Sequence, residues 1–157
     1  MIIINKRNLF FLISVWLLST LLSAQNVTIS TPHTQLLLSV PNGGTPEQLY
    51  YGSRTSDADI RSICETARRR NAYPVYGMGY PCETALSVRH ADGNLTLQMA
   101  VIGVKETRLT KENATLTVIE LKDKVYPFFV NICYKAWQDA DGIETWTEIR
   151  HEEKKPV

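Results

Sequence analysis

Hydrophobic and polar residues alternate with a period of two along most of this chain, which predicts β-strands that bury one face. Turn signals recur between them at short, regular intervals, so we expect an all-β fold, an antiparallel β-sandwich. The expected strands cover residues 27–30, 35–40, 49–51, 84–90, 95–104, 115–121, 126–137 and 143–150.

The clearest alternation surrounds a turn in the middle of the chain. The 84–90 strand ends at His90, and Asp92-Gly93 follows before the return strand 95–104. An Asp-Gly pair favours a two-residue type I′ turn, in which both central residues have positive φ. The first strand is expected to carry Leu86, Val88 and His90 on one face. The return strand is expected to face inwards with Leu95, Leu97, Met99 and Val101.

The longest predicted strand, 126–137, lies after a turn at Lys122-Asp123-Lys124. Alternate residues of a strand share one face, so one face is expected to carry Phe128, Val130, Ile132, Tyr134 and Ala136. The other is expected to carry Phe129, Asn131, Cys133, Lys135 and Trp137.

One stretch has helical rather than strand character. Ser56 can cap a helix, acidic residues follow in the first turn, and apolar residues from Ile60 to Ala67 recur at helical spacing. The closing Arg68-Arg69-Arg70 suits a helix C-terminus. We expect a short helix or an ordered loop here.

Residues 1–24 are typical of a signal peptide. Lys6 and Arg7 precede an apolar run from Leu9 to Leu22, and small residues lead to Ala24. The apolar run is shorter than the roughly 20 residues that a membrane-spanning helix needs. We expect export to the periplasm or exterior of a bacterium, cleavage near Ala24 and no membrane contact afterwards, with an uncleaved anchor as the alternative. The remaining residues, 25–157, form one partial β-sandwich domain.

Composition and net charge limit the kinds of molecule that this chain is expected to bind. The chain is 44% hydrophobic and 21% charged, as in ordinary globular proteins. Its 17 basic and 16 acidic residues become 15 and 16 without residues 1–24, a net charge of −1. A nucleic-acid-binding protein would show a basic face, and Arg68-Arg69-Arg70 is better interpreted as a solvated surface loop. We therefore expect no nucleic-acid partner.

The cysteines indicate neither a metal nor a cofactor. Cys64, Cys82 and Cys133 fit no CxxC pattern, and an odd count leaves at least one thiol unpaired. Cys133 is expected to be a small hydrophobe in a strand. A Cys64–Cys82 bridge is compatible with the sequence but not favoured by it.

Four segments together carry a family resemblance. Residues 72–94 read AYPVYGMGYPCETALSVRHADGN, and DKVYPFFVNICY, ETWTEI and HEEKKPV follow downstream. They resemble the N-terminal domain of glycoside hydrolase family 36, the α-galactosidases. The resemblance implies the first part of that family's N-terminal β-supersandwich. It also implies a truncated chain, because the family's catalytic barrel would begin well beyond Val157.

No catalytic residue can be carried over from the family. A retaining glycosidase needs two carboxylates about 5–5.5 Å apart, and the family's nucleophile lies in a lysine-tryptophan-aspartate motif. After residue 24 the only tryptophans are Trp137 and Trp146, and no aspartate follows either. Other candidate carboxylate pairs are Asp57 with Asp59, Asp139 with Asp141, and Glu144 with Glu148, all better explained as structural. The histidines His33, His90 and His151 lie outside any nucleophile motif.

Aromatic side chains are the feature most compatible with sugar binding, although core packing explains most of them. The candidates are Tyr50, Tyr51, Tyr76, Tyr80, Trp137 and Trp146. Tyr80 is the best candidate, since the corresponding loop of family members helps to shape the sugar pocket, sometimes that of a neighbouring subunit. Here the loop reads Gly79-Tyr80-Pro81-Cys82 without the family's arginine.

The sequence thus predicts a non-catalytic fragment of a secreted α-galactosidase, which supports the barrel and borders its pocket. Its carbohydrate partner, an α-galactoside, would bind through the missing catalytic domain, and a homo-oligomer is compatible with this. A stand-alone exported carbohydrate-binding module is the alternative, and a structural or adhesive surface domain is a third.

Overall fold

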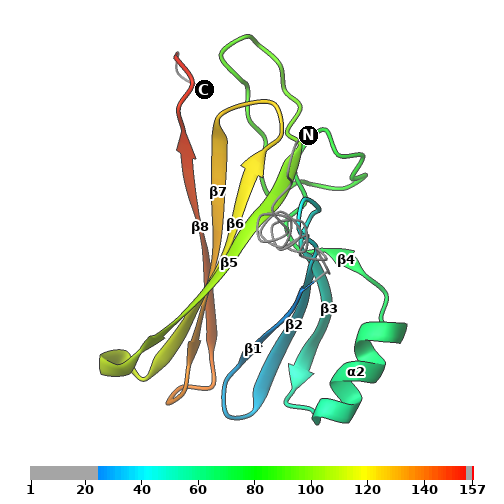
Figure 1. The fold of residues 1–157 in the computed structure, drawn as a ribbon, viewed down its shortest axis with the longest axis vertical. Coiled ribbons are helices and arrows are strands. Elements are labelled where there is room, and N and C mark those ends of the chain that lie inside the picture. The colour runs from blue at the N-terminus through cyan, green and yellow to red at the C-terminus, as the bar shows by residue number, and fades with distance from the viewer. Residues whose placement is uncertain (1–24, 155–156) are drawn as a thin grey trace, which may run out of the picture.

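The computed structural model describes residues 25–154 and 157. It contains two four-stranded antiparallel sheets packed as a sandwich, with the long second sheet extending well beyond the first at the upper end of the view (Figure 1). The all-β antiparallel fold is as predicted. The predicted signal peptide, residues 1–24, lies outside the described residues.

The first sheet has the order β1-β2-β3-β4. Its strands are β1 (Gln25–Ser30), β2 (Thr34–Val40), β3 (Glu47–Ser53) and β4 (Arg70–Asn71). The predicted turn between β2 and β3 forms, with the Gly44 amide donating to the Pro41 carbonyl at 3.0 Å. The same turn reaches the second sheet, because the Gly43 amide donates to the Val101 carbonyl at 2.9 Å. This turn therefore ties the two layers together.

The second sheet has the order β5-β6-β7-β8. Its strands are β5 (Met99–Leu109), β6 (Ala114–Asp123), β7 (Phe128–Trp137) and β8 (Ile143–His151), with the 3-10 turn η1 (Thr110–Glu112) between β5 and β6. The prediction that 126–137 is the longest strand is wrong, because β5 has 11 residues and β7 has 10. The β6–β7 turn also lies later than predicted, after Asp123, whose carboxylate shapes it.

The core lies between the sheets, where the five predicted residues of β7 are all buried. Aliphatic side chains of the first two strands pack against them from the other layer. These are Val27, Ile29, Leu36, Leu38 and Val40. Burial of this alternating set explains why the period-two pattern located β7 correctly.

Helix α2 (Asp57–Thr66) confirms the predicted helical stretch, and the Asp59 amide donates to the Ser56 hydroxyl at its N-terminus. The expected basic C-terminus is wrong, because the helix ends before the arginines and its last turn holds no basic residue. Arg69 instead bridges to Glu47 of β3 at 2.9 Å. None of the helices in the described part of the chain is long and apolar enough to cross a membrane.

The predicted strand at 84–90 is wrong, because this segment forms only one isolated bridge, between Val75 and Leu86. Its backbone bonds to the preceding segment, with the Tyr76 amide donating to the Leu86 carbonyl at 3.0 Å. The alternation in burial still holds, ending at the buried His90. The return strand begins at Met99, and Leu95 is 47% exposed rather than buried.

The turn after His90 also differs from the expected type I′ form. The Gly93 amide donates to the His90 carbonyl, and the His90 amide donates to the Asn94 carbonyl, each at 2.8 Å. Positive φ occurs at Gly93 but not at Asp92. These features describe a three-residue loop, a type I turn followed by a left-handed glycine.

Candidate functional site

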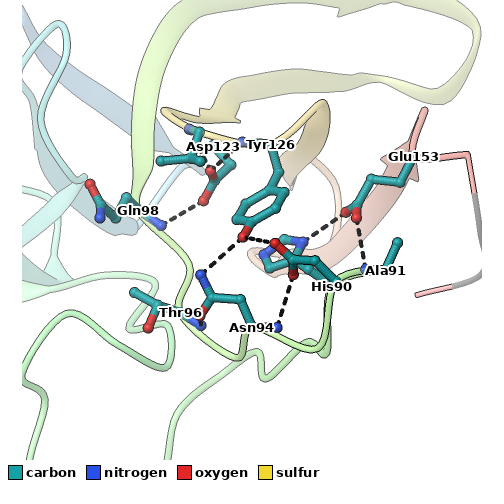
Figure 2. Close-up of polar contacts among 10 residues, drawn as sticks. His90, Ala91, Asn94, Thr96, Gln98, Asp123, Tyr126 and Glu153 are labelled. Atoms are coloured by element: carbon teal, nitrogen blue, oxygen red, sulfur yellow. Dashed lines mark hydrogen bonds and ion pairs between the residues drawn. The ribbon is translucent and has the colours of Figure 1, made fainter.

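The segment from Tyr73 to Gln98, called the signature segment below, contains no named strand. Side-chain contacts with other elements add to the backbone hydrogen bonds within it. His90 anchors this segment, and its ring is fully buried. The ring stacks on Tyr126 at a centroid distance of 3.7 Å and meets Phe128 edge-on at 5.9 Å. Figure 2 shows this ring between the β6–β7 turn and the C-terminal segment. The turn of residues 90–94, called the signature turn below, is therefore anchored to residues more than thirty positions away.

Glu153 fastens the turn from the C-terminal side. Its Oε1 lies 2.7 Å from His90 Nδ1, and its Oε2 accepts the Ala91 amide at 2.9 Å (Figure 2). His90 Nε2 is buried and has no partner within the described part of the chain. This geometry assigns the ring proton to Nδ1, because a proton on Nε2 would have no acceptor. Burial alone would raise the pKa of Glu153, but the hydrogen bonds from His90 and Ala91 outweigh it and hold the pKa below its ordinary value.

Tyr126 links the other side of the turn. Its hydroxyl donates to Asp92 Oδ2 at 2.7 Å and accepts from Asn94 Nδ2 at 3.0 Å. The Asn94 amide, and then the Tyr126 hydroxyl, hold the pKa of Asp92 below its ordinary value. Donation to Asp92 raises the pKa of Tyr126 in turn. One aromatic side chain thus stacks on the histidine and also ties two polar residues of the turn.

Asp123 positions Tyr126 itself. This aspartate is buried at the end of β6. Its Oδ1 accepts the Val125 and Tyr126 amides at 2.7 and 2.8 Å, and its Oδ2 accepts the Gln98 amide at 2.6 Å. One carboxylate therefore shapes the β6–β7 turn and fixes the start of β5.

The buried side chains of this network, His90, Asp123 and Glu153, orient the chain and have no exposed group that could reach a substrate. The His90 ring is fully buried, and the carboxylates of Asp123 and Glu153 are buried acceptors of backbone amides. A general acid or base must come within hydrogen-bonding distance of the substrate. The network is therefore an architectural support for the signature segment.

The loop after Val75 presents the predicted sugar-contact residue. Tyr80 is 42% exposed, and Tyr76 and Met78 are also exposed on the same loop. Gly77 has φ +97°, and a Cβ there would lie 2.6 Å from Thr96 Cγ2. The loop therefore rests directly on the chain that follows the signature turn and presents an uncharged, aromatic surface.

Four of the other five aromatic candidates lie in strands away from the Tyr80 loop. Tyr50 and Tyr51 belong to β3, where Tyr50 donates to the Ser53 carbonyl at 2.8 Å. Trp137 and Trp146 belong to β7 and β8, and their ring nitrogens donate to Glu144 and Glu148, each at 3.3 Å. Tyr76 shares the Tyr80 loop.

The three candidate carboxylate pairs have structural positions. Asp57 and Asp59 lie in the first turn of α2. Asp139 accepts from Asn113. Asp141 accepts from the Thr31 hydroxyl and the His33 and Thr34 amides, which joins the β7–β8 turn to the first sheet. The hydrogen bonds from Thr31 and His33 hold the pKa of Asp141 below its ordinary value.

Glu144 and Glu148, the third pair, accept from the two tryptophans. His33 and His151 are exposed on the surface. Across residues 25–154, no group of three or more metal-binding side chains comes together. The thiols of Cys64, Cys82 and Cys133 are free, and Cys133 is buried in β7 as predicted.

Sequence reasoning missed the partners of His90. Tyr126 and Glu153 lie in DKVYPFFVNICY and HEEKKPV, two of the segments that carry the family resemblance. The structure shows that these segments contact the signature turn. The occurrence of all these segments in one sequence was therefore the signal that sequence analysis could have used. No local pattern indicated which of their residues touch.

Comparison with known proteins gives a consistent result. Residues 44–157 match the model of the glycosyl hydrolase family 36 N-terminal domain. A comparison with curated proteins finds no match.

Solved structures share the fold. The α-galactosidase AgaA A355E from Geobacillus stearothermophilus has a TM-score of 0.71 and 14% identity, covering 82% of this chain and 22% of that one. The α-galactosidase from Lactobacillus brevis has a TM-score of 0.67 and 16% identity, with coverages of 80% and 21%. The galactosidase domain of AgaSK, an α-galactosidase-sucrose kinase, has a TM-score of 0.63 and 21% identity, with coverages of 78% and 21%. The matched part of this chain spans about a fifth of each of those structures.

Proposed function

The chain belongs to the glycosyl hydrolase family 36 N-terminal domain family, and from that premise we propose that it is a non-catalytic supporting domain of an α-galactosidase. In this proposal the sandwich packs beside a catalytic barrel and borders its sugar pocket. The barrel would bind and hydrolyse terminal α-galactosides. The sandwich would hold the rim of that pocket in position.

The observation that carries this proposal is the fixed geometry of the signature segment. His90, Tyr126 and Glu153 hold a segment that lacks strands of its own, as described above. Such a network stabilises one loop conformation, which a pocket rim requires. The carboxylates of the described residues that could suggest catalysis are engaged in structural hydrogen bonds or lie at a helix start. A supporting role accounts for both features.

Within this proposal, Tyr80 contacts the sugar. Its half-exposed ring lies on an uncharged loop held against Thr96, and such a ring can stack on a pyranose face. In the assembled enzyme, Tyr80→Ala should raise KM for an α-galactoside and leave kcat nearly unchanged. Tyr51→Ala, an exposed tyrosine on β3, is the matched control and should change neither constant. Equal KM values for the wild type and Tyr80→Ala would remove Tyr80 from the pocket.

We also propose that the protein is exported, on the strength of the basic start and apolar run within residues 1–24. Expression in a bacterial host followed by fractionation should place the protein outside the cytoplasm. Its N-terminal sequence should then begin at or near Gln25. A cytoplasmic protein that retains Met1 would contradict export.

The supporting role is tested most simply by reading the transcript beyond the Val157 codon. The proposal predicts that it continues, in frame or after a shift, into a barrel with the lysine-tryptophan-aspartate motif. Unrelated downstream sequence would contradict a supporting role and favour the stand-alone carbohydrate-binding module.

A further inference from the structure

Strand β8 forms one edge of the second sheet, and its outer side pairs with no other strand of residues 25–154 (Figure 1). It pairs with β7 over all nine of its residues without a bulge. The other described edges are shorter or interrupted, because β4 has two residues, β1 has six, and β5 carries a register shift between Val101 and Gly103. Short strands and bulges keep a sheet edge from pairing, and β8 has neither.

The backbone of β8 alternates between groups that bond to β7 and groups that point outwards. At its two ends, the Trp137 amide donates to the Gly142 carbonyl and the Glu152 amide donates to the Pro127 carbonyl, each at 2.9 Å. Residues two apart in an antiparallel ladder point the same way, so the even-numbered residues of β8 bond to β7. The N–H and C=O groups at the free edge therefore belong to Ile143, Thr145, Thr147, Ile149 and His151.

A second copy of β8 can meet all of these groups in one antiparallel register. Pairing about a two-fold axis at Thr147 places outward-pointing residues opposite one another along the whole strand, from Ile143 to His151. On the outer face of the sheet, the same register places each Glu144 opposite Arg150 of the second copy. Opposite charges in directly opposed positions stabilise an antiparallel pair.

Neighbouring registers bring like charges together. The smallest shift that keeps every side chain on its own face moves the strands by two residues. With the axis at Trp146, Glu144 lies opposite Glu148 of the second copy, and with the axis at Glu148 this residue lies opposite its own counterpart. Like charges directly opposite each other are destabilising. Charged residues usually protect an edge from pairing, but this charge pattern favours one self-complementary register.

Glu144 and Arg150 are both placed to make this contact. Both residues are exposed, and the Arg150 side chain is 60% exposed. Glu144 accepts from Trp137 Nε1 at 3.3 Å, and Arg150 donates to Glu152 and lies 4.0 Å from the Phe129 ring centroid. A carboxylate has about four acceptor sites and a guanidinium has five donors, so each retains capacity for the second copy.

We propose that β8 pairs with β8 of a second copy of this chain, which joins the two second sheets into one continuous antiparallel sheet. Such a two-fold contact uses the same surface on both copies. It would also cover Ile149, which is 52% exposed and would lie opposite Thr145 of the second copy. The contact requires only the folded sandwich, so it does not depend on the supporting role proposed above.

Sedimentation equilibrium of the purified full chain over a hundredfold range of concentration tests the pairing. We expect a monomer–dimer equilibrium. Glu144→Arg and Arg150→Glu should each raise the dimer dissociation constant roughly tenfold, because each change creates two like-charge contacts across the axis. The double variant exchanges the two charges and should recover the wild-type constant. Thr147→Pro, which removes the central free N–H of an edge strand, should remain folded but monomeric.

Matched controls separate the edge from general charge effects. Glu65→Arg and Arg61→Glu make the same charge changes at exposed positions of α2, and both should associate as the wild type does. Urea unfolding of each variant checks that its sandwich is intact. A wild-type chain that stays monomeric, or that forms only larger oligomers, would overturn the proposal. So would a double variant that associates no better than either single variant.

Discussion

Replacement of Asp123 by alanine tests the physical basis of the signature segment. This buried carboxylate accepts three backbone amides, those of Gln98, Val125 and Tyr126, at 2.6–2.8 Å. Two of them shape the β6–β7 turn that carries the tyrosine stacked on His90. The third fixes the chain just before β5, so its loss should loosen both supports of the segment.

The expected cost follows from these three bonds. A hydrogen bond to a charged group contributes roughly 1.5–3 kcal/mol. Because the turn amides can partly rehydrate, Asp123→Ala should lower the free energy of unfolding by about 3–5 kcal/mol rather than by the full sum. Asp123→Asn retains one oxygen for Val125 and Tyr126 but turns an NH₂ group towards the Gln98 amide. It should cost about 1–3 kcal/mol.

Urea unfolding followed by tryptophan fluorescence measures these differences. Asp57→Ala is the matched control, since this exposed aspartate at the start of α2 should contribute less than about 1 kcal/mol. If Asp123→Ala unfolds within 1 kcal/mol of the wild type, or no more easily than Asp57→Ala, the side-chain network does not hold the segment.

Three further predictions concern other residues. The folded-state pKa of Glu153 lies below its ordinary value of 4.5, so the ionised carboxylate stabilises the fold above pH 4.5 and this effect is lost as the pH falls through the folded-state pKa. The urea midpoint should therefore drop on acidification, and it should drop less in Glu153→Gln. Gly77→Ala should lower the melting temperature more than Gly79→Ala, because both have positive φ but only the first would add a Cβ within 3 Å of its neighbours; equal losses would show that the close approach is unimportant. Iodoacetamide at pH 8 should modify the exposed Cys82 in the native protein, whereas Cys133 should react only after unfolding, because it is buried and burial raises its thiol pKa to about 11. Mass spectrometry of the modified peptides distinguishes the two cysteines.

The sequence located the regular part of the fold well, because burial on one face imposes a period of two. The alternation from Phe128 to Ala136 in β7 is the clearest case, because the five residues predicted to share one face are all buried. Ser56 likewise marked the start of α2 through its capping side chain. These features depend on local pattern, so one sequence suffices to find them.

The sequence could not show where the segment around residues 84–90 finds its partners. Its burial alternates as in a strand, yet its backbone bonds run back to Pro74 and Tyr76 rather than forward to residues 95–98. Leu95 lies before the start of β5, outside any strand, and is exposed. The contact of His90 with Glu153 spans 63 positions, and no local pattern encodes such a contact.

Tyr80 was singled out through the family resemblance, and the structure places it on an exposed loop. Its contact with a sugar is the proposal that the assembled enzyme can test.

The most direct test of the supporting role is the release of galactose from an α-galactoside by the purified full chain. The account predicts no release above that of a matched blank, because the candidate carboxylate pairs occupy structural positions. Sustained turnover that scales with the concentration of the folded protein would contradict it.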